Sequence, residues 1–217
     1  MESPLHGPER ITAISRYIGR ANLRKRLAGL EGTPGRSAYR AGLASLELPN
    51  ETLSVRPPFG LSHVGEYDFV HVAPLLAALE QDRTVGVLLV RLGGYAVGVL
   101  EGERLVASKV GRRNVHGRNS AGGWSQTRFR RRREEQARML VEAAGETAVR
   151  ILTPYLHRLD AVALGGDRFA VRDTLHTSRE LEALRARALP RFFDVPDPRQ
   201  SVLERFAYDL YAAEVTG

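Results

Sequence analysis

A glycine-rich segment that ends in an uncharged amide, Gln126, is the part of this chain best suited to chemistry. Residues 117–126 read Gly-Arg-Asn-Ser-Ala-Gly-Gly-Trp-Ser-Gln, and an arginine-rich stretch follows at once. Glycine reaches backbone conformations that other residues avoid, so a loop of this kind can bring its main chain close to a ligand. A carboxamide at the tip with positive charge behind it suits a polyanionic substrate. The segment therefore indicates chemistry carried out on RNA.

Positive charge is concentrated around this segment. The formal net charge of the 217-residue chain is +7, and nearly all of its basic residues are arginine. Codon bias in a GC-rich genome accounts for the choice of arginine but not for its clustering. Between Arg104 and Arg138 lie eleven basic residues and only two acidic ones. Because the planar guanidinium group binds phosphate through paired hydrogen bonds, the candidate RNA contacts are the arginines in and after the loop: Arg112, Arg113, Arg118, Arg128, Arg130, Arg131, Arg132 and Arg133.

Each candidate also has a purely structural interpretation. Gln126 suits the capping region of a helix, and arginines 130–133 suit a solvated helix face. Trp124, the only tryptophan, suits either stacking on an RNA base or anchoring the loop locally. Ser125 has no His and Asp placed in sequence to suggest a triad, so we do not expect it to act as a nucleophile.

Composition argues against several other classes of protein. The chain has no cysteine, so disulfides and thiolate metal sites are excluded, and its histidines lack the spacing of metal ligands. We expect no cofactor and no metal. No run of about 18 apolar residues is present and the N-terminus has no secretory signal, so we expect a cytoplasmic protein that does not enter a membrane. Hydrophobic residues make up 43% of the chain, which is enough for a sizeable core.

Three strands are expected to carry the loop. The apolar runs at 85–92 and 95–100, with Gly93-Gly94 between them, predict a β-hairpin. A third strand at 104–110 completes an antiparallel meander, and the glycine-rich loop at 111–126 follows it.

A long helix that starts near Thr127 is expected to follow the loop, because apolar residues recur there at three- and four-residue steps. Pro154 should end or kink this helix. A strand at 162–166, helices at 168–175 and 178–186, a strand at 191–195 and a helix at 202–215 complete the pattern. Residues 83–217 therefore predict an α/β domain with a mixed, largely antiparallel sheet of about five strands covered by helices.

Residues 1–82 predict an N-terminal extension of helix and loop. Apolar residues recur at helical spacing over 9–30, among arginines that suggest a further RNA-binding helix. Residues 31–66 are rich in Gly, Pro and Ser, which favours loop with one short strand, and Pro74 is expected in the first turn of a short helix.

The order of these features resembles the central domain of the eukaryotic and archaeal class-1 peptide release factors. That domain carries Gly-Gly-Gln in its loop, then Ser-x-x-Arg-Phe and a run of Arg and Glu; here Gln126 is followed by Thr-Arg-Phe-Arg-Arg-Arg-Arg-Glu-Glu. Trp124 and Ser125 separate Gly122-Gly123 from Gln126, and this spacing is similar to that of the Vms-like release factors (VLRF), whose actinobacterial branch is the match we suggest. The resemblance covers about residues 83–217, and Asp194-Val195 near its end also fits.

This resemblance implies a codon-independent peptidyl-tRNA hydrolase that releases nascent chains from stalled ribosomes or large subunits. Gly122 and Gly123 would give the loop its course, Gln126 would position water or stabilise the oxyanion, and the arginines and Trp124 would bind RNA. The implied partners are large-subunit ribosomal RNA and peptidyl-tRNA, and we expect the chain to act as a monomer. Two alternatives stay open: cleavage of the tRNA 3′ end, in which eukaryotic relatives are implicated, and Pelota-like ribosome binding without catalysis.

Overall fold

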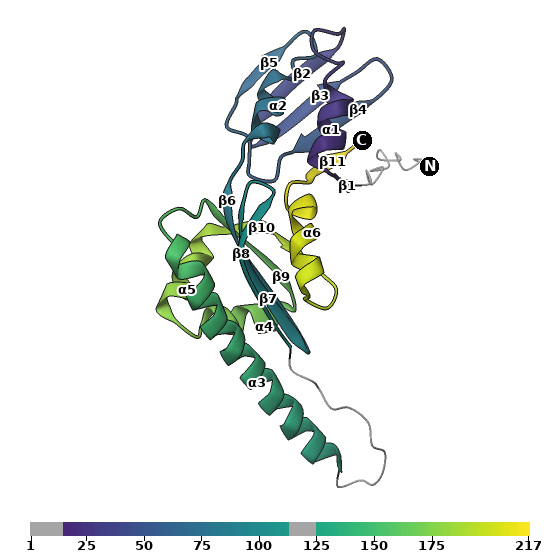
Figure 1. Cartoon of the computed structure of the whole chain (residues 1–217). Coiled ribbons are helices and arrows are strands. Elements are labelled where there is room, and N and C mark those ends of the chain that lie inside the picture. The colour runs from purple at the N-terminus through teal and green to yellow at the C-terminus, as the bar shows by residue number, and fades with distance from the viewer. Residues whose placement is uncertain (1–14, 113–124) are drawn as a thin grey trace, which may run out of the picture. The chain divides into compact units, whose positions relative to one another are not determined.

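The computed structural model describes residues 15–112 and 125–217, with the backbone alone described for residues 125–129. The chain divides into two compact units, each with its own hydrophobic core. The central unit comprises Asp82–Leu210, and the N-terminal unit comprises the residues up to Gln81 together with Tyr211–Gly217. Figure 1 labels the helices and strands of both units.

The central unit is built on a five-stranded mixed sheet. The strands β6, β7 and β8 pair antiparallel as a meander, whereas β9 pairs parallel with both β6 and β10. The predicted meander and the predicted mixed sheet of about five strands are therefore confirmed. In the order β10-β9-β6-β7-β8, the strands are β10 (Ala188–Phe193), β9 (Ala161–Gly166), β6 (Thr84–Arg91), β7 (Gly94–Glu101) and β8 (Arg104–Arg112).

Helices cover both faces of this sheet. On one face, Leu140, Ala144 and Val171 belong to a core cluster that includes alternate side chains of β6 and β7. On the opposite face, a Cβ atom added to Gly98 of β7 would lie 3.0 Å from the side chain of Leu203. Strands covered on both faces appear in sequence as continuous apolar runs. The helices of the first face are α3 (Ser125–Leu152), α4 (Arg168–Leu175) and α5 (Arg179–Leu184), and that of the second is α6 (Gln200–Leu210).

Two features noted in the sequence have structural roles here. Pro154 lies in a 3-10 turn, Thr153–Tyr155, directly after the end of α3, as its missing N–H requires. Gly166, the last residue of β9, has a φ of +100°, and a Cβ atom there would overlap the carbonyl oxygen of Val90. A Cβ atom at Gly165 would lie 2.7 Å from the carbonyl oxygen of Phe193. The glycine pair therefore lets β9 end in close contact with its two neighbouring strands.

The N-terminal unit is a six-stranded antiparallel sheet, not the predicted extension of helix and loop. Leucines of α1 (Arg20–Leu27) and α2 (Ala73–Glu80) belong to its core. In the order of the sheet, the strands are β1 (Ser15–Ile18), β11 (Ala213–Thr216), β4 (Thr52–Arg56), β3 (Leu43–Glu47), β2 (Arg36–Arg40) and β5 (Gly65–Tyr67).

Three expectations are corrected by this sheet. The segment 31–66, expected to be loop with one short strand, holds several short strands, in which buried residues alternate with exposed or half-buried ones and no long apolar run occurs. The predicted helix at 9–30 is helical only over Arg20–Leu27 within its described part. The predicted helix at 202–215 stops at Leu210, and Ala213–Thr216 instead forms β11 between β1 and β4. The end of the chain thus returns to the N-terminal unit.

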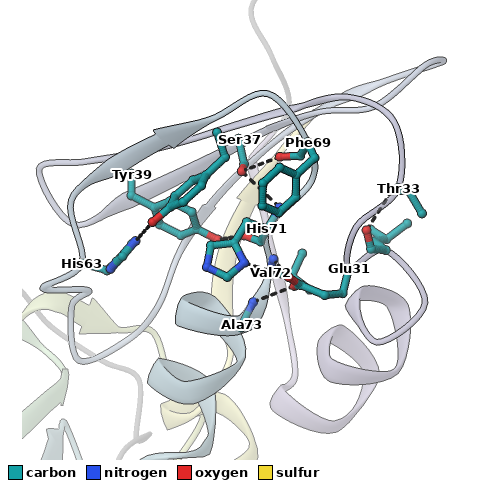
Figure 2. Close-up of polar contacts among 11 residues, drawn as sticks. Glu31, Thr33, Ser37, Tyr39, His63, Phe69, His71, Val72 and Ala73 are labelled. Carbon is teal, nitrogen blue, oxygen red and sulfur yellow. Dashed lines mark hydrogen bonds and ion pairs between the residues drawn. The ribbon is translucent and has the colours of Figure 1, made fainter.

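A hydrogen-bond network around Glu31 fastens the start of α2 (Figure 2). One carboxylate oxygen of Glu31 lies 2.7 Å from Nδ1 of His71. The other accepts hydrogen bonds from the backbone N–H groups of Val72 at 2.6 Å and Ala73 at 3.0 Å. From β2, the hydroxyl of Tyr39 donates to the carbonyl oxygen of His71. Glu31 therefore caps α2 from a distant part of the chain, because it satisfies N–H groups that the first helical turn leaves free.

We expect Glu31→Gln to destabilise the start of α2 by about 1 kcal/mol at neutral pH, the usual cost of losing a helix cap. The hydrogen bond with His71 holds the pKa of Glu31 below its ordinary value; burial opposes this shift, and the N–H groups of Val72 and Ala73 add to it. A carboxylate with a lowered folded-state pKa stabilises the fold above its unfolded pKa, and that contribution is lost as the pH falls through the folded pKa. Hydrogen exchange of the α2 amides, at about pH 7 and about pH 3.5, should therefore show a difference between variant and wild type that shrinks in acid.

Asp68→Asn is the matched control for this experiment. It removes a carboxylate whose side chain is 96% exposed and lies 3.7 Å from Arg36, so exchange of the α2 amides should not change. Equal protection of wild type and Glu31→Gln at neutral pH would contradict the capping role.

Candidate catalytic segment and nucleic-acid interface

Several strand ends meet at one end of the central sheet, which we call the loop end. Arg91, the last residue of β6, pairs with Gly94 at the start of β7, and Gly94 pairs with Arg112 at the end of β8. Gly166 at the end of β9 pairs with Val90 of β6. Because Arg112 is the last residue of β8, the glycine-rich segment of the sequence follows directly from the loop end.

Helix α3 extends beyond the loop end as an arm. Its last residue, Leu152, contacts Gly86 near the start of β6, so the earlier turns of the helix lie toward the loop end. Among the described side chains of α3, Leu140 is the first that is buried, and none over 130–139 is buried. Figure 1 shows this half of α3 projecting past the strands. At about 1.5 Å per residue, the arm from Ser125 to Leu140 is about 22 Å long.

The arm stays helical with little packing because its residues favour helix intrinsically. Arginine, glutamate, glutamine and alanine occupy positions 130–138, and all four rank high in helix propensity. Arg130 lies 3.8 Å from Glu134, one helical turn later, and Arg138 lies 3.8 Å from Glu142. Pairs at this spacing contribute a few tenths of a kcal/mol each.

Arginines 130–133 give the arm a positive surface on all sides. Successive helical residues differ by about 100° around the axis, and all four side chains are exposed. Attraction between Arg130 and Glu134 is weak, because both side chains are about two-thirds exposed or more. Among the described side chains we find no ion pair of Arg131, Arg132 or Arg133. Their charges are available to an anionic partner.

Gln126 lies in the first turn of α3, so its backbone is helical. Arg128 lies in the same turn and is described by its backbone alone. Gln126 therefore lies at the far end of the arm, where it could face a ligand. The same position also fits the interpretation of Gln126 as part of the capping region of the helix. The remaining predicted site residues lie outside the described part of the chain: Gly122, Gly123, Trp124, Arg113 and Arg118.

Arg112 has an acidic neighbour that periodicity and motif spacing do not reveal. Its guanidinium lies 3.9 Å from the carboxylate of Asp197. Across the loop end, Arg91 lies 3.5 Å from the carboxylate of Asp194 and donates to the carbonyl oxygen of Val195 at 2.6 Å. The Asp194-Val195 segment thus fastens the chain after β10 to the end of β6. Arg91 and Arg112 therefore each have a nearby carboxylate, whereas arginines 131–133 of the arm have none among the described side chains.

The basic residues of α1 are a weaker candidate for RNA binding. Arg24 lies 2.5 Å from a carboxylate oxygen of Glu80, and Arg26 lies 2.8 Å from one of Glu51. These ion pairs compensate much of the charge that led us to expect an RNA-binding helix there.

Two further kinds of site are not found in the part of the chain that the structure describes. No group of three or more His, Asp or Glu side chains there is placed to hold a metal ion. No described helix combines the length and apolar character needed to cross a bilayer.

Comparison with known proteins agrees with this arrangement. The family model described as "Actinobacteria/chloroflexi VLRF1 release factor" matches residues 83–216. Peptide chain release factor subunit 1 of Pyrococcus abyssi is 30% identical over 110 residues, which cover 48% of this chain and 27% of that protein. Its counterpart from Thermococcus sibiricus is 30% identical over 95 residues, or 43% of this chain and 23% of that one. The matched region thus spans about a quarter of each relative.

Among solved structures, an archaeal translation termination factor, aRF1, aligns with a TM-score of 0.41 and 19% identity over 89% of this chain and 55% of that one. The "Vms1 mitochondrial localization core" aligns with a TM-score of 0.41 and 11% identity over 89% and 80%. The family model covers well over half of the chain, including the whole sheet of the central unit and the arm. The chain therefore belongs to the VLRF1 release factor family of Actinobacteria and Chloroflexi.

Proposed function

We propose that this chain hydrolyses the ester bond of peptidyl-tRNA on stalled ribosomes or large subunits, in the cytoplasm and without reading a codon. The observation that carries the proposal is the position of Gln126 in the first turn of an exposed, arginine-rich arm. Membership in a release factor family supports a role in translation. An arm about 22 Å long suits a substrate bond that RNA encloses, because it carries a reactive group far from the bulk of the domain.

The arginines would hold the arm against the RNA backbone. A guanidinium group binds a phosphate through two parallel hydrogen bonds, and the arm presents such groups in several directions. Ribosomal RNA or the acceptor stem of tRNA would supply the phosphates to Arg128 and arginines 130–133, with Arg113 and Arg118 adding contacts from the loop. Recognition of this kind depends on RNA shape more than on base sequence.

In the proposed reaction, water attacks the carbonyl carbon of the ester, and a tetrahedral oxyanion forms. The oxyanion collapses as the bond to the ribose 3′ oxygen breaks, and that oxygen leaves with a proton. The products are a peptide with a free carboxylate and a tRNA with an intact 3′ end. Water is a poor nucleophile that must be held in line, so the amide of Gln126 would act by positioning it or by donating a hydrogen bond to the oxyanion.

A neutral side chain suits this task because a charged one would lose its hydration in the enclosed site. Transfer of an unpaired carboxylate out of water costs far more than transfer of an amide. Gly122 and Gly123 would let the loop follow a backbone course closed to other residues. Trp124 would stack on a terminal base of the tRNA.

The products of the reaction test this proposal. Large subunits that carry labelled peptidyl-tRNA should yield free peptide and full-length tRNA when they are incubated with the protein. A tRNA shortened at its 3′ end would show cleavage of a phosphodiester bond instead, the reaction in which eukaryotic relatives are implicated. Binding without either product would leave a ribosome-binding factor. Puromycin, which accepts the peptide directly, serves as the control that the peptidyl-tRNA is reactive.

A further inference from the structure

We propose that Phe169, flanked by Arg168 and Arg172, is a stacking site for an unpaired RNA base at the loop end of the central unit. The inference rests on the proposed function for the identity of the partner, since RNA is the polymer that the arm would bind. It adds a contact on α4 that neither the sequence motifs nor the arm includes. It would fix the position of a single-stranded nucleotide beside the base of the arm.

Phe169 has no role in the core. The residue is 70% exposed, although it lies in a helix whose other apolar residues pack inward. Val171 and Leu175 of the same helix are almost fully buried in the central core. Single exposed aromatic residues are common on protein surfaces, so the case for a ligand depends on the groups that surround this ring.

The surroundings of Phe169 suit a nucleotide more than an apolar protein surface. The guanidinium of Arg172 lies over the ring, 5.3 Å from its centroid, and is held by the carboxylate of Asp173 at 2.7 Å. Arg168 lies over the ring of Phe192 at 4.3 Å, and we find no ion pair for it among the described residues. The ring of Phe169 offers a surface on which a base can stack, and the neighbouring Arg168 offers a positive charge for the adjoining phosphate. An isolated ring among charged side chains is too small a patch for a protein partner.

The location of Phe169 connects it to the candidate catalytic segment. Asp167 lies two residues before Phe169, and its backbone N–H donates to the carbonyl oxygen of Val90 at 2.7 Å. This hydrogen bond places the start of α4 at the loop end. Helix α4 packs against α3, because Val171 and Leu140 belong to the same core cluster. Phe169 therefore lies at the end of the unit from which the arm projects. RNA that follows the arm toward the sheet would reach it.

Binding of short single-stranded RNA tests the inference directly. The probes are one oligonucleotide and a series in which a single position at a time lacks its base, measured at low salt by fluorescence anisotropy. Wild type should bind the intact RNA roughly 5- to 150-fold more tightly than the abasic RNA at one position, the range expected for one base stacked on an aromatic ring. Phe169→Ala should bind the intact RNA as weakly as wild type binds the abasic one. Phe169→Tyr should keep the preference.

Tyr208→Ala is the matched control, since Tyr208 on α6 of the same unit is 62% exposed. Its preference for intact RNA should equal that of wild type. Because Phe169 is so exposed, its alanine variant should fold normally, which circular dichroism checks. A wild type that binds intact and abasic RNA equally, or a Phe169→Ala variant that keeps the preference, overturns the inference. Peptide release plays no part in these measurements, so loss of the hydrolase proposal and loss of the stacking site would be separate results.

Discussion

Gln126→Ala is expected to slow peptide release from stalled large subunits by about 10²–10³-fold, the usual effect of removing one hydrogen-bond donor from an oxyanion site. Alanine favours helix at least as well as glutamine, so the first turn of α3 should persist and only the carboxamide is lost. Affinity for the large subunit should change little, because the arginines of the arm remain. Single-turnover release of labelled peptide gives the rate, and co-sedimentation with the subunit gives the binding.

Gln136→Ala is the matched control for that variant. It removes the same group from the same helix ten residues later, within the exposed half of α3, and should release peptide at the wild-type rate. Gln126→Glu, which keeps the shape of the side chain but adds charge, should be as slow as Gln126→Ala. Release by Gln126→Ala at the wild-type rate would remove this residue from the mechanism and leave the hydrolase proposal without its reactive group.

The triple variant Arg131→Gln, Arg132→Gln, Arg133→Gln is expected to bind the large subunit on the order of 100-fold more weakly at moderate salt. These side chains are exposed, and no described carboxylate pairs with them, so each is free to displace counterions from RNA. Each lost phosphate contact should lower the slope of log affinity against log salt by about 0.7–0.9. Three contacts therefore predict a slope lower by roughly 2–3, measured by titrations over a range of salt concentrations.

A second triple variant separates the effect of the arm's arginines on binding from the effect of the protein's net charge. Arg104→Gln, Arg150→Gln and Arg179→Gln remove three exposed charges from other parts of the central unit, at the start of β8, late in α3 and at the start of α5. Its affinity should fall far less than that of the arm variant. Equal losses in the two triple variants would mean that the arm has no special part in binding.

The central unit is predictable from sequence because burial leaves a strong signal there. Its first two strands lie between helices on both faces, so they appear as uninterrupted apolar runs. The apolar stripe of the long helix is dense from Leu140 onward, where the helix contacts the sheet, and charge is the main signal of the arm before that point. β10 runs from Ala188 to Phe193, whereas the sequence predicts this strand at 191–195. It includes Pro190, which an edge strand tolerates, and β10 lies at the edge of its sheet.

The N-terminal sheet and the side-chain contacts at the loop end could not be predicted from the sequence, because burial leaves no comparable pattern there. Small or polar residues such as Ser37 and Ala44 are buried in short strands whose ends are exposed arginine or glutamate, so their sequence pattern does not differ from that of a loop. Arg112 lies near Asp197 because two segments distant in sequence are brought together by the fold. The exposure of Phe169 likewise depends on which segments pack against α4. Such contacts follow from topology, which local periodicity does not carry.

The place of β11 in the N-terminal sheet has a consequence for folding during synthesis. Among the described strands, β1 pairs with β11 alone, and β4 pairs with β11 on one side, although the whole central unit separates β11 from both in sequence. As the chain leaves the ribosome, the central unit can complete its sheet before β11 is synthesised. Until then the N-terminal sheet lacks the strand that joins β1 to β4. During that interval β4 presents an open edge that invites pairing with another nascent chain or protection by a chaperone.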